Sequence, residues 1–121
     1  MYYRHETGNL GEEEAVKYLL KDDYEIIQRN FNSNFGEIDI IAKDNKKNEI
    51  VFIEVKTRSN QRYGNPAEAV DYYKKKHFIK TVEYFIHINK LENRFIRIDI
   101  MEVYLSKKGL TKINHLKQAF D

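Results

Sequence analysis

Apolar residues recur every three or four positions in two segments of the chain. The segment 11–21 (GEEEAVKYLLK) has this helical spacing and opens with acids, whose charge is favourable near a helix N-terminus. We therefore predict a first helix over about residues 4–21. The segment 67–89 (AEAVDYYKKKHFIKTVEYFIHIN) has the same period and predicts a second helix.

The other apolar segments alternate with polar residues, which is the pattern of strands. They cover residues 24–31, 36–43, 49–58 and 94–105. The polar turn DNKKN joins the second strand to the third and predicts a hairpin. The tail, 111–120, is ambiguous, and we expect a short strand followed by a frayed helical turn. The resulting order, α-β-β-β-α-β with a short tail, predicts one mixed α/β domain over residues 1–121.

Four charged residues lie within the predicted hairpin. Strand alternation puts Glu37 and Asp39 on one face of their strand, and Glu54 and Lys56 on one face of the next. If the hairpin closes symmetrically about residues 46–47, Asp39 lies opposite Glu54 and Glu37 opposite Lys56, with Cβ atoms ~4.5–5.5 Å apart. Two opposed carboxylates favour a shared cation, and Mg²⁺ takes one or two protein carboxylates together with substrate phosphate oxygens and water. A lysine beside such an ion predicts phosphodiester hydrolysis.

Two alternatives remain at this point. The hairpin charges are also compatible with a half-exposed sheet, on which Lys56 and Glu37 form an ordinary cross-strand ion pair. Glu12 projects from the apolar face of the first helix, where an acid is either a partner of the helix dipole or a third acid at the metal.

Asp39 followed by Glu54-Val55-Lys56 resembles the D…ExK signature of the PD-(D/E)xK nuclease superfamily. The stretches GEEEAVKYL, RNF, GEIDIIA, VFIEVKTR, EAV…K, RID and AF, spread over nearly the whole chain, resemble the YraN-like family of small uncharacterised bacterial proteins. The resemblance implies a restriction-endonuclease-like core, with a mixed central sheet flanked by helices. That family is similar in turn to archaeal Holliday junction resolvases, in which a glutamate of the first helix joins the Asp and the ExK at a divalent metal.

Carried over residue by residue, the resemblance implies Glu12, Asp39, Glu54 and Lys56 as the catalytic set. Mg²⁺ or Mn²⁺ would be held by Asp39, Glu54 and the backbone carbonyl of Val55, with Glu12 binding directly or through water. The resemblance also implies a homodimer, because a symmetric junction must be cut twice.

Further residues are candidates for contact with nucleic acid. They are Arg58, Arg62, Tyr63 and Lys74. The stretch FNSN at 31–34 is less basic than the resemblance leads us to expect, which argues against DNA contact there. We expect four aromatic residues of the second helix to pack against the sheet rather than stack on bases. They are Tyr72, Tyr73, Tyr84 and Phe85.

Composition narrows the chemistry and the compartment. The chain has no cysteine, which excludes disulfides, CxxC zinc sites and thiol catalysis. No segment approaches the ~20 apolar residues of a membrane span, and the N-terminal residues lack the apolar core of a signal peptide, so we expect a cytoplasmic protein. The net charge of +2 is compatible with nucleic acid but does not indicate it alone.

The sequence therefore predicts a metal-dependent endonuclease that hydrolyses phosphodiester bonds in DNA, with branched or structured DNA as substrate. One alternative is a nucleic-acid-binding module of the same fold whose cleavage is weak or depends on a partner. Another is an interaction protein that keeps the fold for stability only, which the intact set of charged residues disfavours because unpaired buried charges are costly.

Overall fold

The computed structural model describes residues 3–58, 72–106 and 111–120 of the 121-residue chain, with side chains from residue 9 onward. Its elements follow the order predicted from the sequence, with a fifth strand in the tail. They are α1 (Tyr3–Lys21), β1 (Tyr24–Asn32), β2 (Glu37–Asp44), β3 (Glu49–Arg58), α2 (Tyr72–Ile88), β4 (Phe95–Tyr104) and β5 (Lys112–Leu116). The part of the second helix predicted for residues 67–71 lies outside the described residues. The tail forms the short strand that was expected, followed by a turn.

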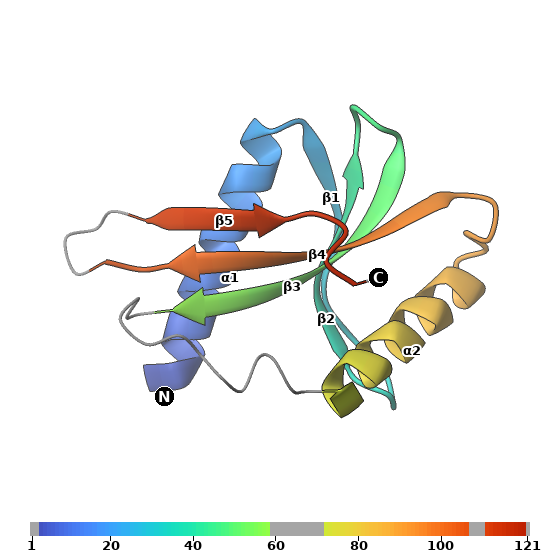
Figure 1. Ribbon diagram of the computed structural model, residues 1–121, viewed down its shortest axis with the longest axis horizontal. Coiled ribbons are helices and arrows are strands. Elements are labelled where there is room, and N and C mark those ends of the chain that lie inside the picture. The colour runs from blue at the N-terminus through green and yellow to red at the C-terminus, as the bar shows by residue number, and fades with distance from the viewer. Residues whose placement is uncertain (1–2, 59–71, 107–110, 121) are drawn as a thin grey trace.

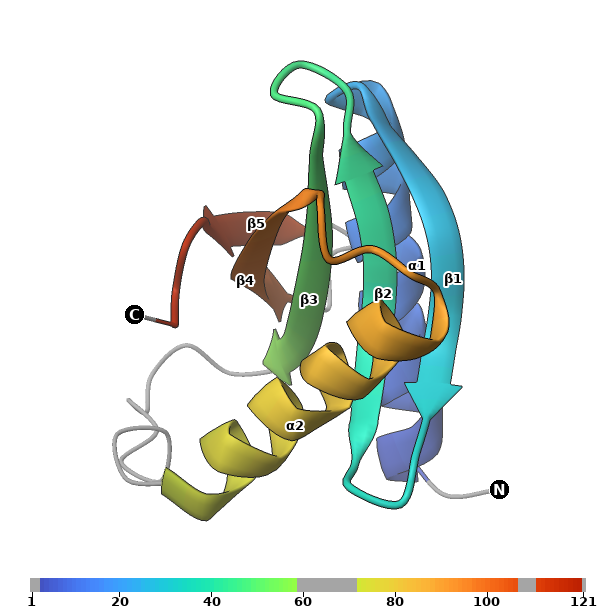
Figure 2. The ribbon, with the colours of Figure 1, turned by 90° about the vertical axis from the view of Figure 1, so that its right-hand side faces the viewer.

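Within the described residues the sheet has five strands in the order β1-β2-β3-β4-β5. The pairs β1–β2, β2–β3 and β4–β5 are antiparallel and β3–β4 is parallel, so the predicted mixed sheet is confirmed. Helix α1 covers one face and α2 the other (Figures 1 and 2). This is an α/β fold with the predicted α-β-β-β-α-β order, followed by a fifth strand.

Each helix buries its apolar stripe in a separate core. On the α1 side, Ala15 and Leu19 pack against Ile40, Val51 and other aliphatic residues of the sheet. The α2 core is more aromatic and is built around Phe52, Phe78 and Phe85 on the sheet and helix. Because both faces of the central strands are covered, β2 and β3 read as nearly continuous apolar runs, and charges within those runs require a separate explanation.

The predicted hairpin register is confirmed where β2 and β3 pair. Five pairs, from Asp44↔Glu49 to Ile40↔Ile53, follow the predicted symmetry. The pairing then ends, so Asp39 and Glu54 are the next residues in register but do not form a ladder pair. Figure 2 shows β2 and β3 separating toward the ends that lie beside the first turns of α2. The charged end of the hairpin is therefore a place where the sheet opens.

A buried polar network lies toward the other end of these strands. Arg97 of β4 donates hydrogen bonds to Asp44 Oδ2 at 2.9 Å, to Asp99 Oδ1 at 2.9 Å and to the Tyr24 hydroxyl at 2.6 Å. His115 Nε2 lies 2.7 Å from Asp99 Oδ2. Burial works to raise the pKa of Asp99, but the hydrogen bonds from His115 and Arg97 outweigh it and hold that pKa below its usual value. The network ties β1, β2, β4 and β5 together.

None of the helices in the described part of the chain is long and apolar enough to cross a membrane.

Candidate functional site

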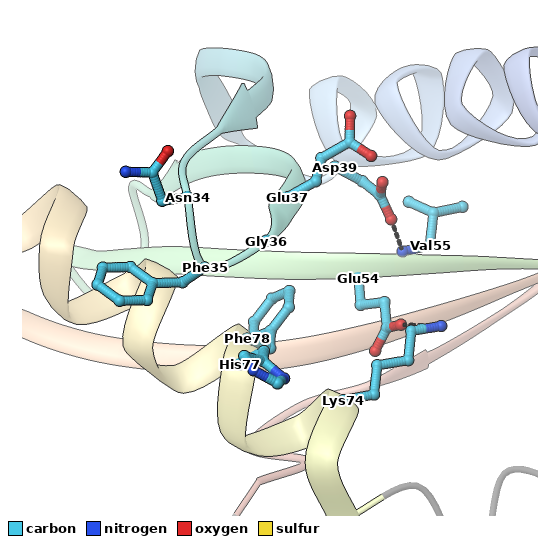
Figure 3. Close-up of a pocket in the computed structure, with 10 residues that line it drawn as sticks. All are labelled: Asn34, Phe35, Gly36, Glu37, Asp39, Glu54, Val55, Lys74, His77 and Phe78. Carbon is cyan, nitrogen blue, oxygen red and sulfur yellow. Dashed lines mark hydrogen bonds and ion pairs between the residues drawn. The ribbon is translucent and has the colours of Figure 1, made fainter.

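A pocket of about 610 Å³ opens where β2 and β3 separate, between the β1–β2 turn and α2 (Figure 3). Acidic, basic and aromatic residues share its lining. Those that matter for its chemistry are Phe35, Glu37, Asp39, Glu54, Lys74 and His77. The sequence therefore brings both predicted metal-binding carboxylates to one cavity, although they are fifteen positions apart along the chain.

Asp39 occupies the gap between the strands. Its Oδ2 accepts a hydrogen bond from the backbone N–H of Val55 at 2.8 Å, in the place where a backbone carbonyl would continue the ladder (Figure 3). Burial raises the pKa of Asp39 to about 7; the Val55 hydrogen bond opposes this rise, and the charges of Glu12, Glu37 and Glu54 add to it. Asp39 therefore gains or loses its proton near neutral pH, and its ionised form can bind a cation.

Glu54 stands between two hollows. On one side it lines the pocket that contains Asp39, and on the other it lines a smaller hollow of about 180 Å³ together with Lys56, Lys74 and Lys75. Lys74 of α2 lines both and forms an ion pair with Glu54, with 3.3 Å between Nζ and Oε2. The site thus has an acidic compartment and a lysine-rich compartment that share one carboxylate. Lys56, two residues after Glu54, lies in the lysine-rich compartment, as its position on the same strand face requires.

Glu12 of α1 approaches the site from the opposite face of the sheet. Burial raises its pKa, Arg29 partly offsets that effect from 3.5 Å, and the charge of Glu12 in turn raises the pKa of Asp39. Its approach depends on Gly11, because a Cβ atom there would lie 1.9 Å from Thr57 Oγ1 on β3. Glycine at this position therefore lets α1 pack close to the sheet.

The donor set of the acidic compartment fits a hard divalent cation. Among the residues that the structure describes, no three histidine, cysteine or acidic side chains are grouped as a ready-made metal site. Mg²⁺ and Mn²⁺ do not require such a group, because they are commonly held by one or two carboxylates with phosphate oxygens and water completing the shell. Asp39 and Glu54, with the backbone of Val55 in the same lining, offer oxygen ligands of this kind.

The remaining residues expected to contact nucleic acid divide into three cases. Lys74 lines both compartments. Arg58 lies 3.9 Å from Glu102 in an ion pair whose two side chains are largely buried, and it lines neither compartment. Arg62 and Tyr63 lie outside the described residues.

The expectation for the aromatic residues of α2 is wrong in part. Phe85 is buried and Tyr84, although 42% exposed, stacks on Phe31 of β1, but Tyr72 and Tyr73 are 66% and 73% exposed. The buried stripe of α2 consists of Phe78, Thr81, Val82 and Phe85, and it begins about 1.7 turns after Tyr72. Tyr72 and Tyr73, which precede this stripe, therefore present their side chains to solvent.

Of the pocket residues that matter for its chemistry, Phe35 and His77 were not found from the sequence. His77 is three residues after Lys74, a spacing that places both on one helix face, and this was the available signal. Phe35 sits in the β1–β2 turn, outside any periodic element, so no pattern indicated it.

Fold and site together define an α/β protein with a carboxylate-lined pocket at the place where β2 and β3 separate. The chain belongs to the family described as "Uncharacterised protein family UPF0102", whose model matches residues 11–103, and this confirms the YraN-like resemblance. A UPF0102 protein of Caldicellulosiruptor saccharolyticus is 46% identical over 118 residues, covering 97% of this chain and 98% of the relative. A second, from Clostridioides difficile, is 46% identical over 115 residues and covers 95% and 96%.

Among solved structures, the chain is similar to a repair endonuclease from Pyrococcus abyssi, with a TM-score of 0.41 and 18% identity. The match covers 90% of this chain but 41% of that chain.

Proposed function

We propose that this protein is a metal-dependent endonuclease that hydrolyses phosphodiester bonds in DNA, with branched or otherwise structured DNA as its substrate. The observation that carries the proposal is the state of Asp39. It is a partly buried carboxyl group with a pKa raised to about 7, it lines an open pocket, and no cationic side chain among the described residues bonds to it.

The two acids that are fully buried among the described residues each have a cationic partner. Asp44 and Asp99 both accept hydrogen bonds from Arg97. Burial works to raise the pKa of each, but the hydrogen bonds from His115 and Arg97 to Asp99, and from Arg97 and the backbone to Asp44, outweigh it, and each pKa falls below its usual value. An unpaired buried carboxylate is costly in general. A fold that pairs these two acids and leaves Asp39 unpaired is therefore best understood as keeping a place for an external cation.

The residues divide the work between the two compartments. Asp39, Glu54 and the Val55 carbonyl would hold Mg²⁺ or Mn²⁺, which supplies charge stabilisation and an activated water when it is bound. Lys56 orients or polarises the attacking water, or contacts an oxygen of the scissile phosphate. Lys74 and Lys75 lie where they can bind a phosphate adjacent to it, since they share the lysine-rich hollow with Lys56. Glu12 strengthens the negative field at Asp39.

One observation favours the binding module as a second candidate. Glu54, a proposed metal ligand, is held by Lys74, so the acidic compartment must exchange this ion pair for a metal before it can act. A protein that never makes this exchange would bind nucleic acid through its lysines without cleaving it.

The decisive experiment compares labelled flap, fork, four-way-junction and single-stranded DNA incubated with the purified protein in Mn²⁺ or in EDTA. We expect cleavage in Mn²⁺ alone, and its loss in Asp39→Ala and Glu54→Ala. Glu25→Gln is the matched control, because Glu25 is an exposed acid at the far end of β1, where it lies opposite Lys43 in the β1–β2 register. Binding of these substrates without cleavage at any metal concentration would reject the endonuclease in favour of the binding module.

A further inference from the structure

The side of the pocket away from Asp39 carries an exposed aromatic ring. Phe35 lines the pocket and is 43% exposed, although it is a large apolar residue in a short turn (Figure 3). A single exposed apolar side chain is ordinary on a protein surface. Phe35 differs in two respects, the rigidity of the turn that holds it and the neighbours that surround it.

The turn is fixed by hydrogen bonds around Ser33. The backbone N–H groups of Phe35 and Gly36 donate to Ser33 Oγ at 3.0 and 3.3 Å, and the Ser33 N–H donates to the Gly36 carbonyl at 2.8 Å. Ser33 Oγ also lies 3.4 Å from Thr81 Oγ1, which in turn donates to the His77 carbonyl of α2 at 2.8 Å. The turn is thus tied to the buried side of α2.

Gly36 completes this attachment. A Cβ atom at this position would lie 3.3 Å from Thr81 Oγ1, which is tighter than an ordinary contact, so glycine lets the turn sit directly on α2. Phe35 is therefore held in place before any ligand arrives, and binding to its ring costs little ordering of the loop.

The neighbours of Phe35 are aromatic and cationic. Tyr84, itself partly exposed, meets the Phe35 ring edge-on with centroids 6.3 Å apart, and on its other side it stacks with Phe31 at 6.2 Å. Lys80 Nζ lies 5.9 Å from the Phe35 centroid. A π-surface with a positive charge beside it matches a nucleotide, which offers a flat base and an anionic phosphate.

We propose that Phe35, supported by Tyr84 and Lys80, is a stacking site for an unpaired nucleobase next to the cleavage pocket. The substrate class is then nucleic acid with unpaired nucleotides beside the scissile phosphate, such as a flap, a fork or a single strand, rather than continuous duplex. In a duplex the faces of the bases are covered by their neighbours, and a ring on a protein surface cannot reach them unless the base is extruded. The inference rests on the proposed function for the role of the pocket, but the stacking itself can be measured without cleavage.

The chain contains no tryptophan, so Phe35→Trp supplies a single fluorescent reporter at the proposed site. In EDTA, which prevents cleavage, the variant is titrated with an oligothymidylate, an abasic oligonucleotide of the same length and a blunt duplex. The anisotropy of a label on each oligonucleotide reports occupancy. We expect strong quenching of the tryptophan by the oligothymidylate, and at equal occupancy little quenching by the abasic strand or the duplex. The matched control is Phe95→Trp, because Phe95 is 76% exposed and pairs with Glu49 at the far end of the sheet.

A second variant tests the contribution to affinity. Phe35→Leu keeps an apolar side chain but removes the π-face, and we expect it to weaken binding of the oligothymidylate by about 5- to 150-fold, the range that one stacked base represents. Phe35→Tyr should retain the affinity. Circular dichroism and thermal melting confirm that both variants fold.

Equal quenching by the normal and abasic strands, or an unchanged affinity of Phe35→Leu, would overturn the inference. An oligouridylate that quenches as strongly as the oligothymidylate supports the stacking site and extends it to RNA. Quenching without cleavage of any substrate keeps the stacking site and rejects the nuclease. Cleavage without selective quenching keeps the nuclease and rejects the stacking site.

Discussion

Replacing Asp39 by asparagine should make the protein more stable, and increasingly so as the pH rises. Asparagine has nearly the shape of the protonated carboxyl group, and its side-chain carbonyl can still accept the hydrogen bond from Val55. It removes the charge that burial and the neighbouring acids disfavour, an effect that raises the pKa of Asp39 from an ordinary value of 3.8 to about 7. The gain in the free energy of unfolding therefore measures what it costs to ionise Asp39 in the folded protein.

The magnitude follows from proton linkage. Because the pKa is higher in the folded protein, the contribution of Asp39 to stability is fully present below the pKa of the unfolded chain, and it is lost as the pH rises through the pKa of the folded state. With values of 3.8 and about 7, ionisation of Asp39 costs about 2 kcal/mol near pH 5 and about 4 kcal/mol near pH 8. The advantage of Asp39→Asn should therefore grow by roughly 2–3 kcal/mol over this interval.

Urea unfolding of the wild type and the variant in EDTA, at several pH values between these limits, gives the two free-energy curves. Glu25→Gln is the control, since Glu25 is exposed and its removal should leave the pH dependence unchanged. If the difference between Asp39→Asn and wild type stays constant with pH, or if the variant is less stable at high pH, Asp39 is not a strained carboxylate and the main support of the proposed function is lost.

Three further predictions concern the metal, the helix contact and the buried network. Mn²⁺ should raise the melting temperature of the wild type but not that of Glu54→Gln. The rise should shrink below about pH 7, because protons then compete with the metal for Asp39. Equal shifts of the melting temperature in both proteins would exclude Glu54 as a ligand. Gly11→Ala should cost about 1–3 kcal/mol in urea unfolding because of the contact with Thr57, and adding Thr57→Ala should recover part of that loss, whereas strictly additive effects would contradict the contact. Arg97→Ala should cost about 3–5 kcal/mol by the same assay, since it leaves two buried carboxylates without their cation, and a loss under 1 kcal/mol would refute this account of the network.

The sequence was sufficient to predict the elements and the hairpin register. Helical and strand periods are local signals, and the polar connection between β2 and β3 leaves few ways to align two strands whose apolar residues must be covered on both faces. Asn48, at φ 57°, adopts the left-handed conformation that asparagine tolerates at the end of this connection. With the register fixed, the prediction that Asp39 and Glu54 share a site followed, and both line one pocket.

The sequence was not sufficient to predict contacts that depend on how distant segments of the chain come together. Strand alternation put Asp39 on one face of the sheet, but the separation of β2 from β3 lets its carboxylate turn into the gap and bond to Val55. Alternation also makes Arg97 and Asp99 occupy buried positions of β4, a pattern that looks unfavourable until Asp44, more than fifty residues earlier, is brought beside them.

The Arg97 network and the carboxylate pocket both include a glutamate of β3, but at different positions along that strand. Their separation explains how one sheet can support both. Glu49, at the start of β3, accepts a hydrogen bond from Arg97 at 2.8 Å, whereas Glu54 lies five residues further on, about 17 Å along an extended strand. At the first position β2 and β3 are paired, and Asp44 and Glu49 both accept hydrogen bonds from Arg97. At the second position the two strands separate, Glu54 pairs with Lys74, and within the described part of the chain Asp39 accepts a hydrogen bond from the backbone N–H of Val55 but from no cationic side chain. The stability contributed by the Arg97 network can therefore offset the cost of ionising Asp39 where β2 and β3 separate. This is the arrangement expected where a fold supports a site rather than tolerates a defect.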